Sequence, residues 1–215
     1  MAEFLEPGLN ITGVNDVLRE KLLQDKSSFS YSGIWLYTGQ QGSGKTLLAM
    51  HAVKQMLEEY PDALLVSNIS VFGVPSLPYQ GIDDFEKYQN GSKGIIFLID
   101  EIQTLYSSLE SAKMPVSMLT VWSQNRKNRR VILGTSQRYN RVAKGLREQT
   151  KWVYECTRPL LGCFYSYRVR DGADYDDNGK FVGEAERRSW YVPRVSVMRM
   201  YNTLEVVRRE GDEMK

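Results

Sequence analysis

Long apolar runs, cysteine and histidine are all scarce in this sequence. The densest apolar run, residues 94–99, is far shorter than the roughly 20 residues that a membrane-spanning helix needs. The two cysteines, Cys156 and Cys163, have six residues between them, which matches no usual zinc pattern, so we expect two reduced, partly buried thiols. The acidic N-terminus, MAEFLEPG, lacks the basic residues that begin a secretory signal. These absences favour a cytoplasmic protein over an exported or membrane-spanning one.

Net charge is only +2, with 28 basic and 26 acidic residues, and this balance by itself predicts no nucleic-acid partner. The charges are unevenly distributed, however. The stretch 126–151 has a single acid, Glu148, and nine basic residues, which are Arg126, Lys127, Arg129, Arg130, Arg138, Arg141, Lys144, Arg147 and Lys151. Such a block is either a solvated face or a surface that contacts phosphates.

Strand and helix patterns alternate along most of the chain. Apolar stretches predict strands at residues 33–38, 63–69, 94–100, 130–137 and 151–157. Helical periodicity follows the first strand over residues 45–57, and shorter helix signals occur at 15–23, 83–89 and 116–125. This alternation predicts an α/β fold with a mostly parallel central sheet flanked by helices.

The pattern changes after Pro159. Two aromatic stretches, 161–172 and 187–198, are joined by the polar turn ADYDDNGK, and we expect an antiparallel β-hairpin on the edge of the sheet. The turn also matches the first half of a calcium loop, but the closing position of that loop falls on Ala185, so an Asn-Gly hairpin turn is the better interpretation. We therefore expect an N-terminal helical segment at 1–30, the core at 31–158 and a C-terminal hairpin extension of the same domain at 159–215.

The stretch GQQGSGKT, directly after the first expected strand, fits the phosphate-binding P-loop pattern G-x-x-x-x-G-K-[ST]. Its glycines let the backbone curl around a phosphate, and the following helix directs its N-terminal dipole at the same anion. Lys45 would reach the β- and γ-phosphates, and the hydroxyl of Thr46 would bind Mg²⁺. The residues expected to bind the nucleotide are Gly39, Gln40, Gln41, Gly42, Ser43, Gly44, Lys45, Thr46 and Leu47.

Two acids end the buried strand expected at 94–100, as in a Walker B element. Asp100 would lie beside the phosphate loop and hold Mg²⁺ together with Thr46. The adjacent Glu101 would polarise a water molecule for in-line attack on the γ-phosphate, which a kinase of this fold does not need. Strand ends also carry acids for solubility, and this is the competing interpretation.

The strand expected at 130–137 ends in the polar sequence GTSQ. Gln137 would lie between the two nucleotide motifs and could sense the γ-phosphate. Thr135 and Ser136 are neighbouring alternatives, and a simple polar cluster at a strand end is the other interpretation.

The ordered set GQQGSGKT, IIFLIDE and NRKNRRVILGTSQR resembles the FtsK–HerA superfamily of P-loop ATPases over about residues 34–154. The resemblance implies a RecA-like fold, ATP and Mg²⁺ as cofactors, and a homo-oligomeric, hexameric ring that pumps DNA. It also implies that Arg126, eleven residues before Gln137, reaches into the active site of the next subunit. Within the superfamily, the chain looks most like zonula occludens toxin-like and viral genome-packaging ATPases.

The leading function implied by this resemblance is an ATP-driven DNA translocase, a viral genome-packaging motor in the host cytoplasm. We expect Arg129, Arg130, Arg141 and Lys144 to contact DNA phosphates without regard to sequence. The alternative is an ATPase that assembles a phage or secretion complex, with a capsid or membrane complex as its partner. A small-molecule phosphotransferase is disfavoured because Glu101 would be superfluous there.

Overall fold

A computed structural model describes residues 28–107, 121–160, 164–183 and 187–202. The helix expected at 15–23 and Cys163 lie outside these ranges, as does the first half of the helix expected at 116–125. Of its second half, residues 121–123 are helical and residues 124–125 form a turn.

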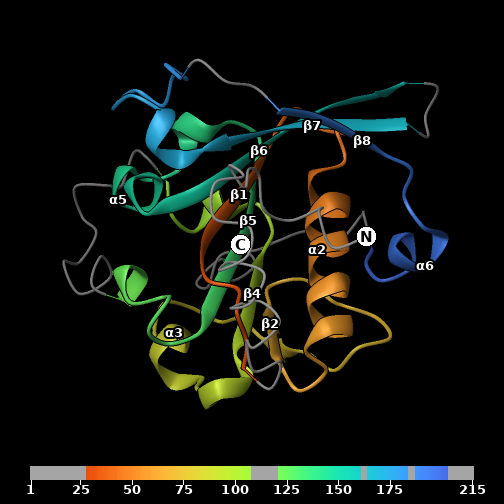
Figure 1. The fold of residues 1–215 in the computed structure, drawn as a ribbon, viewed down its shortest axis with the longest axis vertical. Coiled ribbons are helices and arrows are strands. Elements are labelled where there is room, and N and C mark those ends of the chain that lie inside the picture. The colour runs from red at the N-terminus through yellow and green to blue at the C-terminus, as the bar shows by residue number, and fades with distance from the viewer. Residues whose placement is uncertain (1–27, 108–120, 161–163, 184–186, 203–215) are drawn as a thin grey trace, which may run out of the picture.

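One eight-stranded sheet runs through the described molecule, in the order β3-β2-β4-β5-β1-β6-β7-β8 (Figure 1). Its strands are β1 (Gly33–Thr38), β2 (Leu64–Ser67), β3 (Leu77–Pro78), β4 (Ile95–Ile99), β5 (Arg130–Ser136), β6 (Thr150–Leu160), β7 (Phe164–Asp171) and β8 (Arg187–Tyr191). All pairs from β3 to β6 are parallel, whereas β7 and β8 are antiparallel additions. The α/β fold with a mostly parallel sheet is confirmed. The sequence analysis missed β3, because two exposed residues form no hydrophobic pattern.

Helices cover both faces of the parallel part of the sheet (Figure 1). On one face lies α2 (Lys45–Glu59), and the other face is covered by α3 (Asp84–Lys87), α5 (Lys144–Glu148) and the segment around Trp122. Side chains of β1 alternate between the two cores: Trp35 and Tyr37 pack on the α2 side, while Ile34 and Leu36 pack on the other. Such two-sided burial explains the uninterrupted apolar run in β4.

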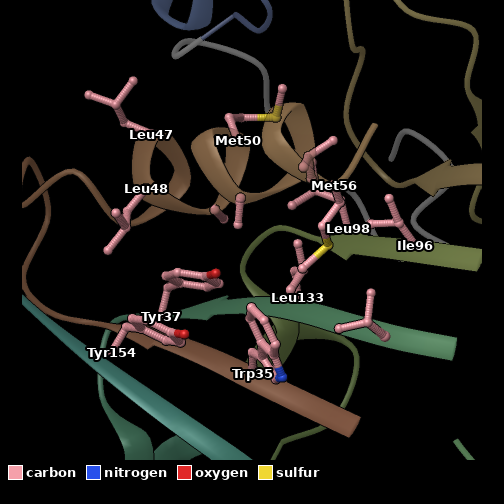
Figure 2. Packing of buried hydrophobic residues seen from close by; sticks show 14 of the residues in the cluster. Trp35, Tyr37, Leu47, Leu48, Met50, Met56, Ile96, Leu98, Leu133 and Tyr154 are labelled. Atoms are coloured by element: carbon pink, nitrogen blue, oxygen red, sulfur yellow. The ribbon is translucent and has the colours of Figure 1, made fainter. Parts of the chain in front are cut away.

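The phosphate-loop helix is anchored on aromatic residues of the sheet. Figure 2 shows Leu48 and Met56 of α2 above Tyr37 and the neighbouring strands. Tyr37 itself stacks on Tyr154 of β6, with ring centroids 4.7 Å apart and an interplanar angle of 16°. This packing fixes the start of α2 relative to the end of β1, where the phosphate loop lies.

The expected C-terminal hairpin is present as β7 and β8, joined to the main sheet through β6. One expectation for this region is wrong. The sequence predicts that the β-rich stretch 187–198 forms one side of the hairpin, but Val195–Met198 forms a helical turn, α6. Val197 is fully buried in the core on the α2 side, so a tertiary contact outweighs the β propensity of the two valines. No helix in the described ranges is long and apolar enough to cross a bilayer.

We expect Gly94→Ala to destabilise the fold far more than Gly91→Ala. Both glycines have positive φ, 77° and 55°, and Gly94 has ψ 167°, a region almost restricted to glycine. The backbone strain of a substitution is therefore about 1–2 kcal/mol at Gly91 and about 1–3 kcal/mol at Gly94. At Gly94 a Cβ would also lie 2.1 Å from the buried ring of Phe29, which adds about 1–3 kcal/mol of overpacking. At Gly91 the space is open. Urea unfolding of both variants measures the difference, and equal losses of stability would contradict the packing argument.

Candidate nucleotide-binding site

The carboxyl ends of β1, β4 and β5 lie side by side, because β5 lies between β4 and β1. Adjacent ends of parallel strands form the usual ligand crevice of open α/β sheets. The segments that follow these strands begin with Gly39, Asp100 and Gln137. The fold therefore brings together three motifs that are far apart in the sequence.

The phosphate loop requires glycine at two positions. The φ angle is 148° at Gly39 and 83° at Gly44. A Cβ at Gly39 would lie 2.4 Å from the carbonyl oxygen of Cys156, and one at Gly44 would lie 2.5 Å from the ring of Tyr165. A side chain at either position would displace a neighbouring strand, so the curl of the loop depends on glycine. Burial raises the pKa of Cys156 to about 12, so this thiol beside the loop stays protonated.

Two buried polar groups in the loop fit a bound phosphate. The side chain of Lys45 is 7 % exposed, and its Nζ donates a hydrogen bond to the carbonyl oxygen of Gln40 at 3.3 Å. The Oγ of Ser43 is buried and has no hydrogen-bond partner among the described residues. Buried donors of this kind are stabilised when an anion accepts from them, and the N-terminus of α2 points at the same place. The residues present therefore fit the phosphates of a nucleotide.

Three oxygen atoms from α2, β4 and β5 meet at the centre of the site. Thr46 Oγ1 donates a hydrogen bond to Asp100 Oδ1 at 2.7 Å, and Thr135 Oγ1 donates to the same carboxylate oxygen at 2.7 Å. A hydroxyl and a carboxylate are ligands that Mg²⁺ prefers, with water and nucleotide phosphates completing its shell. The described residues contain no group of three or more His, Cys, Asp or Glu side chains placed to hold a metal. Thr46 and Asp100 thus fit a Mg²⁺ ion that is bound mainly through the nucleotide.

Asn68, which follows β2, holds the backbone of Asp100 from the neighbouring strand end. Its Nδ2 donates to the carbonyl oxygen of Asp100 at 2.9 Å, and its Oδ1 accepts from the Asp100 N–H at 2.8 Å. The sequence analysis did not find this residue, because an asparagine after a strand carries no motif. The pairing fixes the direction in which the Asp100 carboxylate leaves β4.

Glu101 has an unusual backbone conformation, with φ 50° and ψ 48°. The left-handed region is rare for a residue with a long side chain and is often associated with functional sites. The Glu101 N–H donates to Thr135 Oγ1 at 2.9 Å, which supports this conformation. The carboxylate of Glu101 accepts a hydrogen bond from the amide of Gln103. Glu101 is therefore beside Asp100, with its side chain held by a residue that the sequence analysis did not single out.

Gln137 lies where the sequence predicted, directly after β5 and between the other two motifs. Its side chain is exposed, and its Oε1 accepts a hydrogen bond from Arg141 Nη1 at 3.3 Å. The last residue of β5, Ser136, accepts a hydrogen bond from the Gly39 N–H at 3.3 Å through its carbonyl oxygen. The end of β5 is thus bonded directly to the phosphate loop.

The four basic residues expected to contact DNA do not form one surface. Arg129 and Arg130 lie at the start of β5, whereas Arg141 and Lys144 follow its end, about 23 Å away for a seven-residue strand. Lys144 is paired with Asp177 at 3.0 Å and with Glu148 at 3.7 Å.

Arg130 corrects the expectation most clearly, because its side chain is buried, with 3 % exposed. A buried guanidinium is not a surface contact for a DNA duplex. Among the four, Arg129 and Arg141 keep side chains that are at least partly exposed and not ion-paired within the described residues.

Arg126 is exposed in the turn before β5, at the end of the sheet opposite to Asp100. The length of β5, about 23 Å, separates it from the phosphate loop of its own chain. Arg126 is therefore no part of the site within one subunit.

The C-terminal strands reach the phosphate loop, which no sequence motif indicates. Tyr191 of β8 donates a hydrogen bond from its hydroxyl to the carbonyl oxygen of Gly44 at 3.5 Å. Tyr165 of β7 fills the space beside the Cα of Gly44 and lies against Tyr191, with ring centroids 5.5 Å apart. The antiparallel extension thus forms one wall of the site.

Comparison with protein families matches residues 35–157, more than half of the chain, to the ATPase family associated with various cellular activities (AAA). Comparison with curated protein sequences gives no match.

Several solved structures have a similar fold. The N-terminal domain of zonular occludens toxin from Neisseria meningitidis has a TM-score of 0.61 at 16% sequence identity, over 80% of this chain and 99% of that chain. The genome packaging NTPase B204 from Sulfolobus turreted icosahedral virus 2, in complex with ATP-gammaS, has a TM-score of 0.51 at 14% identity, over 76% of this chain and 98% of that chain. A third solved structure, of another ATPase domain, has a TM-score of 0.52 at 12% identity, over 88% and 96% of the two chains. At these identities the likeness establishes the fold, and the RecA-like fold class is confirmed.

We expect Asn68→Ala to lower kcat for ATP by about 10- to 100-fold with little change in KM, because displacing the Asp100 carboxylate should mainly weaken binding of the transition state. Lys45→Ala should instead remove nucleotide binding. Asn90→Ala is the matched control, since Asn90 Nδ2 also donates to two backbone carbonyls, of Asp62 and Gly94, but at the other end of the sheet. Steady-state kinetics and thermal unfolding separate the effects. If Asn68→Ala only lowers stability, as Asn90→Ala is expected to do, the positioning role is wrong.

Proposed function

The chain belongs to the AAA family of ATPases, and from this premise we propose that it uses ATP hydrolysis to move DNA, as a motor of the genome-packaging kind. The observation that carries the hydrolytic half of the proposal is the convergence of Lys45, Asp100 and Glu101 at one edge of the sheet. The DNA half is supported by the fold shared with a viral genome packaging NTPase and by Arg129 and Arg141, whose side chains are at least partly exposed.

In the proposed reaction, each side chain of the site has one task. Lys45 binds the β- and γ-phosphates, and Thr46 and Asp100 hold Mg²⁺, which neutralises phosphate charge when it is bound. The carboxylate of Glu101 accepts a proton from the water that attacks the γ-phosphate. Gln103 donates to one oxygen of this carboxylate, Oε2, so the other oxygen is left to accept the proton while the hydrogen bond orients the side chain. Gln137 contacts the γ-phosphate from the end of β5.

Charge that spreads over the γ-phosphoryl group during transfer calls for a further cation. We assign this role to Arg126, acting on the site of the neighbouring subunit in a ring. Its exposure and its place at the opposite end of β5 support this assignment, since it cannot serve its own site. An arginine supplied in this way is worth about 10³-fold or more in rate. ATP hydrolysis would then require assembly of the subunits into a ring.

Arg129 and Arg141 are the proposed DNA contacts that agree with the observed exposure, because Arg130 is buried and Lys144 is ion-paired. Each would bind backbone phosphates, which carry no sequence information. DNA of any sequence should therefore serve as cargo.

A second function, assembly of a phage or secretion complex on a protein cargo, is favoured by one observation. The zonular occludens toxin domain has the higher TM-score, 0.61 against 0.51 for the packaging NTPase. The two functions would use the same catalytic residues, so they differ in what stimulates hydrolysis.

We expect double-stranded DNA of arbitrary sequence to raise the ATPase rate several-fold. Replacing both Arg129 and Arg141 with Gln should weaken DNA binding by about tenfold and reduce the salt slope by about 1 per lost contact. Lys87→Gln with Lys93→Gln is the control, which removes the same charge from exposed, acid-paired lysines. Binding is measured with a Glu101→Gln chain, which should retain ATP. Normal ATPase activity that DNA fails to stimulate would favour the assembly function.

We expect an Arg126→Ala chain and a Lys45→Ala chain, each inactive alone, to regain activity when mixed. Some interfaces in mixed rings would join an intact phosphate loop to an intact Arg126. The measurement is ATPase rate against mixing ratio, with subunit exchange monitored by labelled chains. Rings that exchange subunits without recovering activity would refute the assignment of Arg126.

A further inference from the structure

Arg130, the first residue of β5, is a buried cation that has no counter-ion among the described residues. Its Nε and Nη1 are both buried and find no hydrogen-bond partner in the described part of the chain. Its guanidinium carbon lies 5.7 Å and 5.8 Å from the ring centroids of Phe85 and Phe97. These cation–π contacts offset part of the desolvation of the charge, but they do not satisfy the N–H groups of Nε and Nη1. Burial lowers the pKa of Arg130, yet a guanidinium stays protonated at physiological pH. The charge therefore needs an anion.

Beside Arg130 lies a cavity of about 520 Å³ at the end of the sheet opposite to the phosphate loop. It lies between α3 and the turn before β5, and Lys127 and Arg129 also line it. The amide side chains of Gln124 and Asn128 add hydrogen-bonding groups to the same wall. The lining thus combines an arginine fork, further cations and neutral donors, which is the chemistry that recognises an oxyanion.

One acid, Glu86 of α3, is among the residues that line the cavity. It makes no ion pair with Arg130, although its charge acts to raise the pKa of the guanidinium. Glu86 is exposed, so an internal ion pair would require its side chain to move inward. An ion pair between Glu86 and Arg130 is the competing explanation, and the Glu86→Gln variant tests it.

We propose that this cavity is a second anion site that binds a phosphate group, with Arg130 at its inner wall and Lys127 and Arg129 beside it. The volume exceeds what a single carboxylate side chain fills, and an arginine at the inner wall supplies the positive charge and N–H groups that suit a phosphate group. Free phosphate and the backbone of a nucleic-acid strand supply the same group. The site lies about 23 Å from the ATP site along β5, and it would exist whatever cargo the ATPase moves.

The experiment uses the full chain with Lys45→Ala, so that the phosphate loop does not contribute. Calorimetry measures binding of inorganic phosphate and, separately, of a short single-stranded thymidine oligonucleotide. Adding Arg130→Met should weaken the affinity for the ligand at least tenfold. The control is Arg199→Met, because Arg199 is an exposed arginine on the far side of α2, and it should change the affinity less than twofold. In phosphate-free buffer Arg130→Met should unfold at the same or a higher temperature, because it removes an unpaired buried charge.

The two ligands distinguish the source of the phosphate. Stronger, Arg130-dependent binding of the oligonucleotide supports a strand as the ligand, and Arg130-dependent binding of phosphate alone supports a free anion. If Arg130→Met changes the binding of neither ligand, the proposal is wrong. DNA-stimulated ATPase activity is measured independently, so loss of this site does not remove the proposed motor function.

Glu86→Gln gives a second test, which holds even if Arg130→Met fails to fold. Removing this carboxylate should raise phosphate affinity several-fold, because it removes a competing negative charge. The phosphate affinity of Arg130→Lys should lie between that of the parent and that of Arg130→Met, since lysine keeps the charge but lacks the planar guanidinium group. A destabilised Glu86→Gln chain that binds no phosphate would make Glu86 the counter-ion and overturn the proposal.

Discussion

The arrangement of the whole site depends on the hydrogen bonds that converge on Asp100. Thr46 from α2 and Thr135 from β5 donate to one carboxylate oxygen, while Asn68 from the end of β2 holds the Asp100 backbone. Four elements of the fold are thereby joined at a single residue. Because Thr46 and Asp100 are also the proposed magnesium ligands, the same bonds that organise the strand ends would position a bound Mg²⁺ ion. The sheet order, with β5 between β4 and β1, is what makes this convergence geometrically available.

The predictable parts of the molecule are those encoded by neighbouring residues. The phosphate loop is a contiguous motif, β4 is an uninterrupted apolar run and β5 contains the apolar run 131–133, so both the fold class and the place of the Walker residues follow from the sequence. Asn68 could not be found in this way, because its role exists only once β2 and β4 are paired. The same holds for α6, where burial of Val197 overrides local β propensity.

The basic stretch 126–151 is a strong pattern in the sequence, but its residues do not lie together in the fold. Residues at the start and after the end of one strand are close in sequence but lie at opposite edges of the sheet. Within the block, Arg130 is buried against the rings of Phe85 and Phe97, while Arg141 contacts Gln137 beside the nucleotide site. The number of basic residues in the sequence therefore overestimates the exposed positive surface. The sequence also does not indicate that Arg130 is buried, because its burial follows from tertiary packing.

The contact between the C-terminal strands and the phosphate loop has a mechanical consequence. Tyr165 and Tyr191 contact the backbone of Gly44, the residue that precedes α2, directly, because Gly44 has no side chain. Tension along β7 or β8 is thus transmitted to the backbone that would hold the nucleotide, and a change in that backbone pushes back on the strands. In a motor, strain of this kind is the quantity that links a chemical step to a load. These two tyrosines give the antiparallel strands a direct route by which force and nucleotide state act on each other.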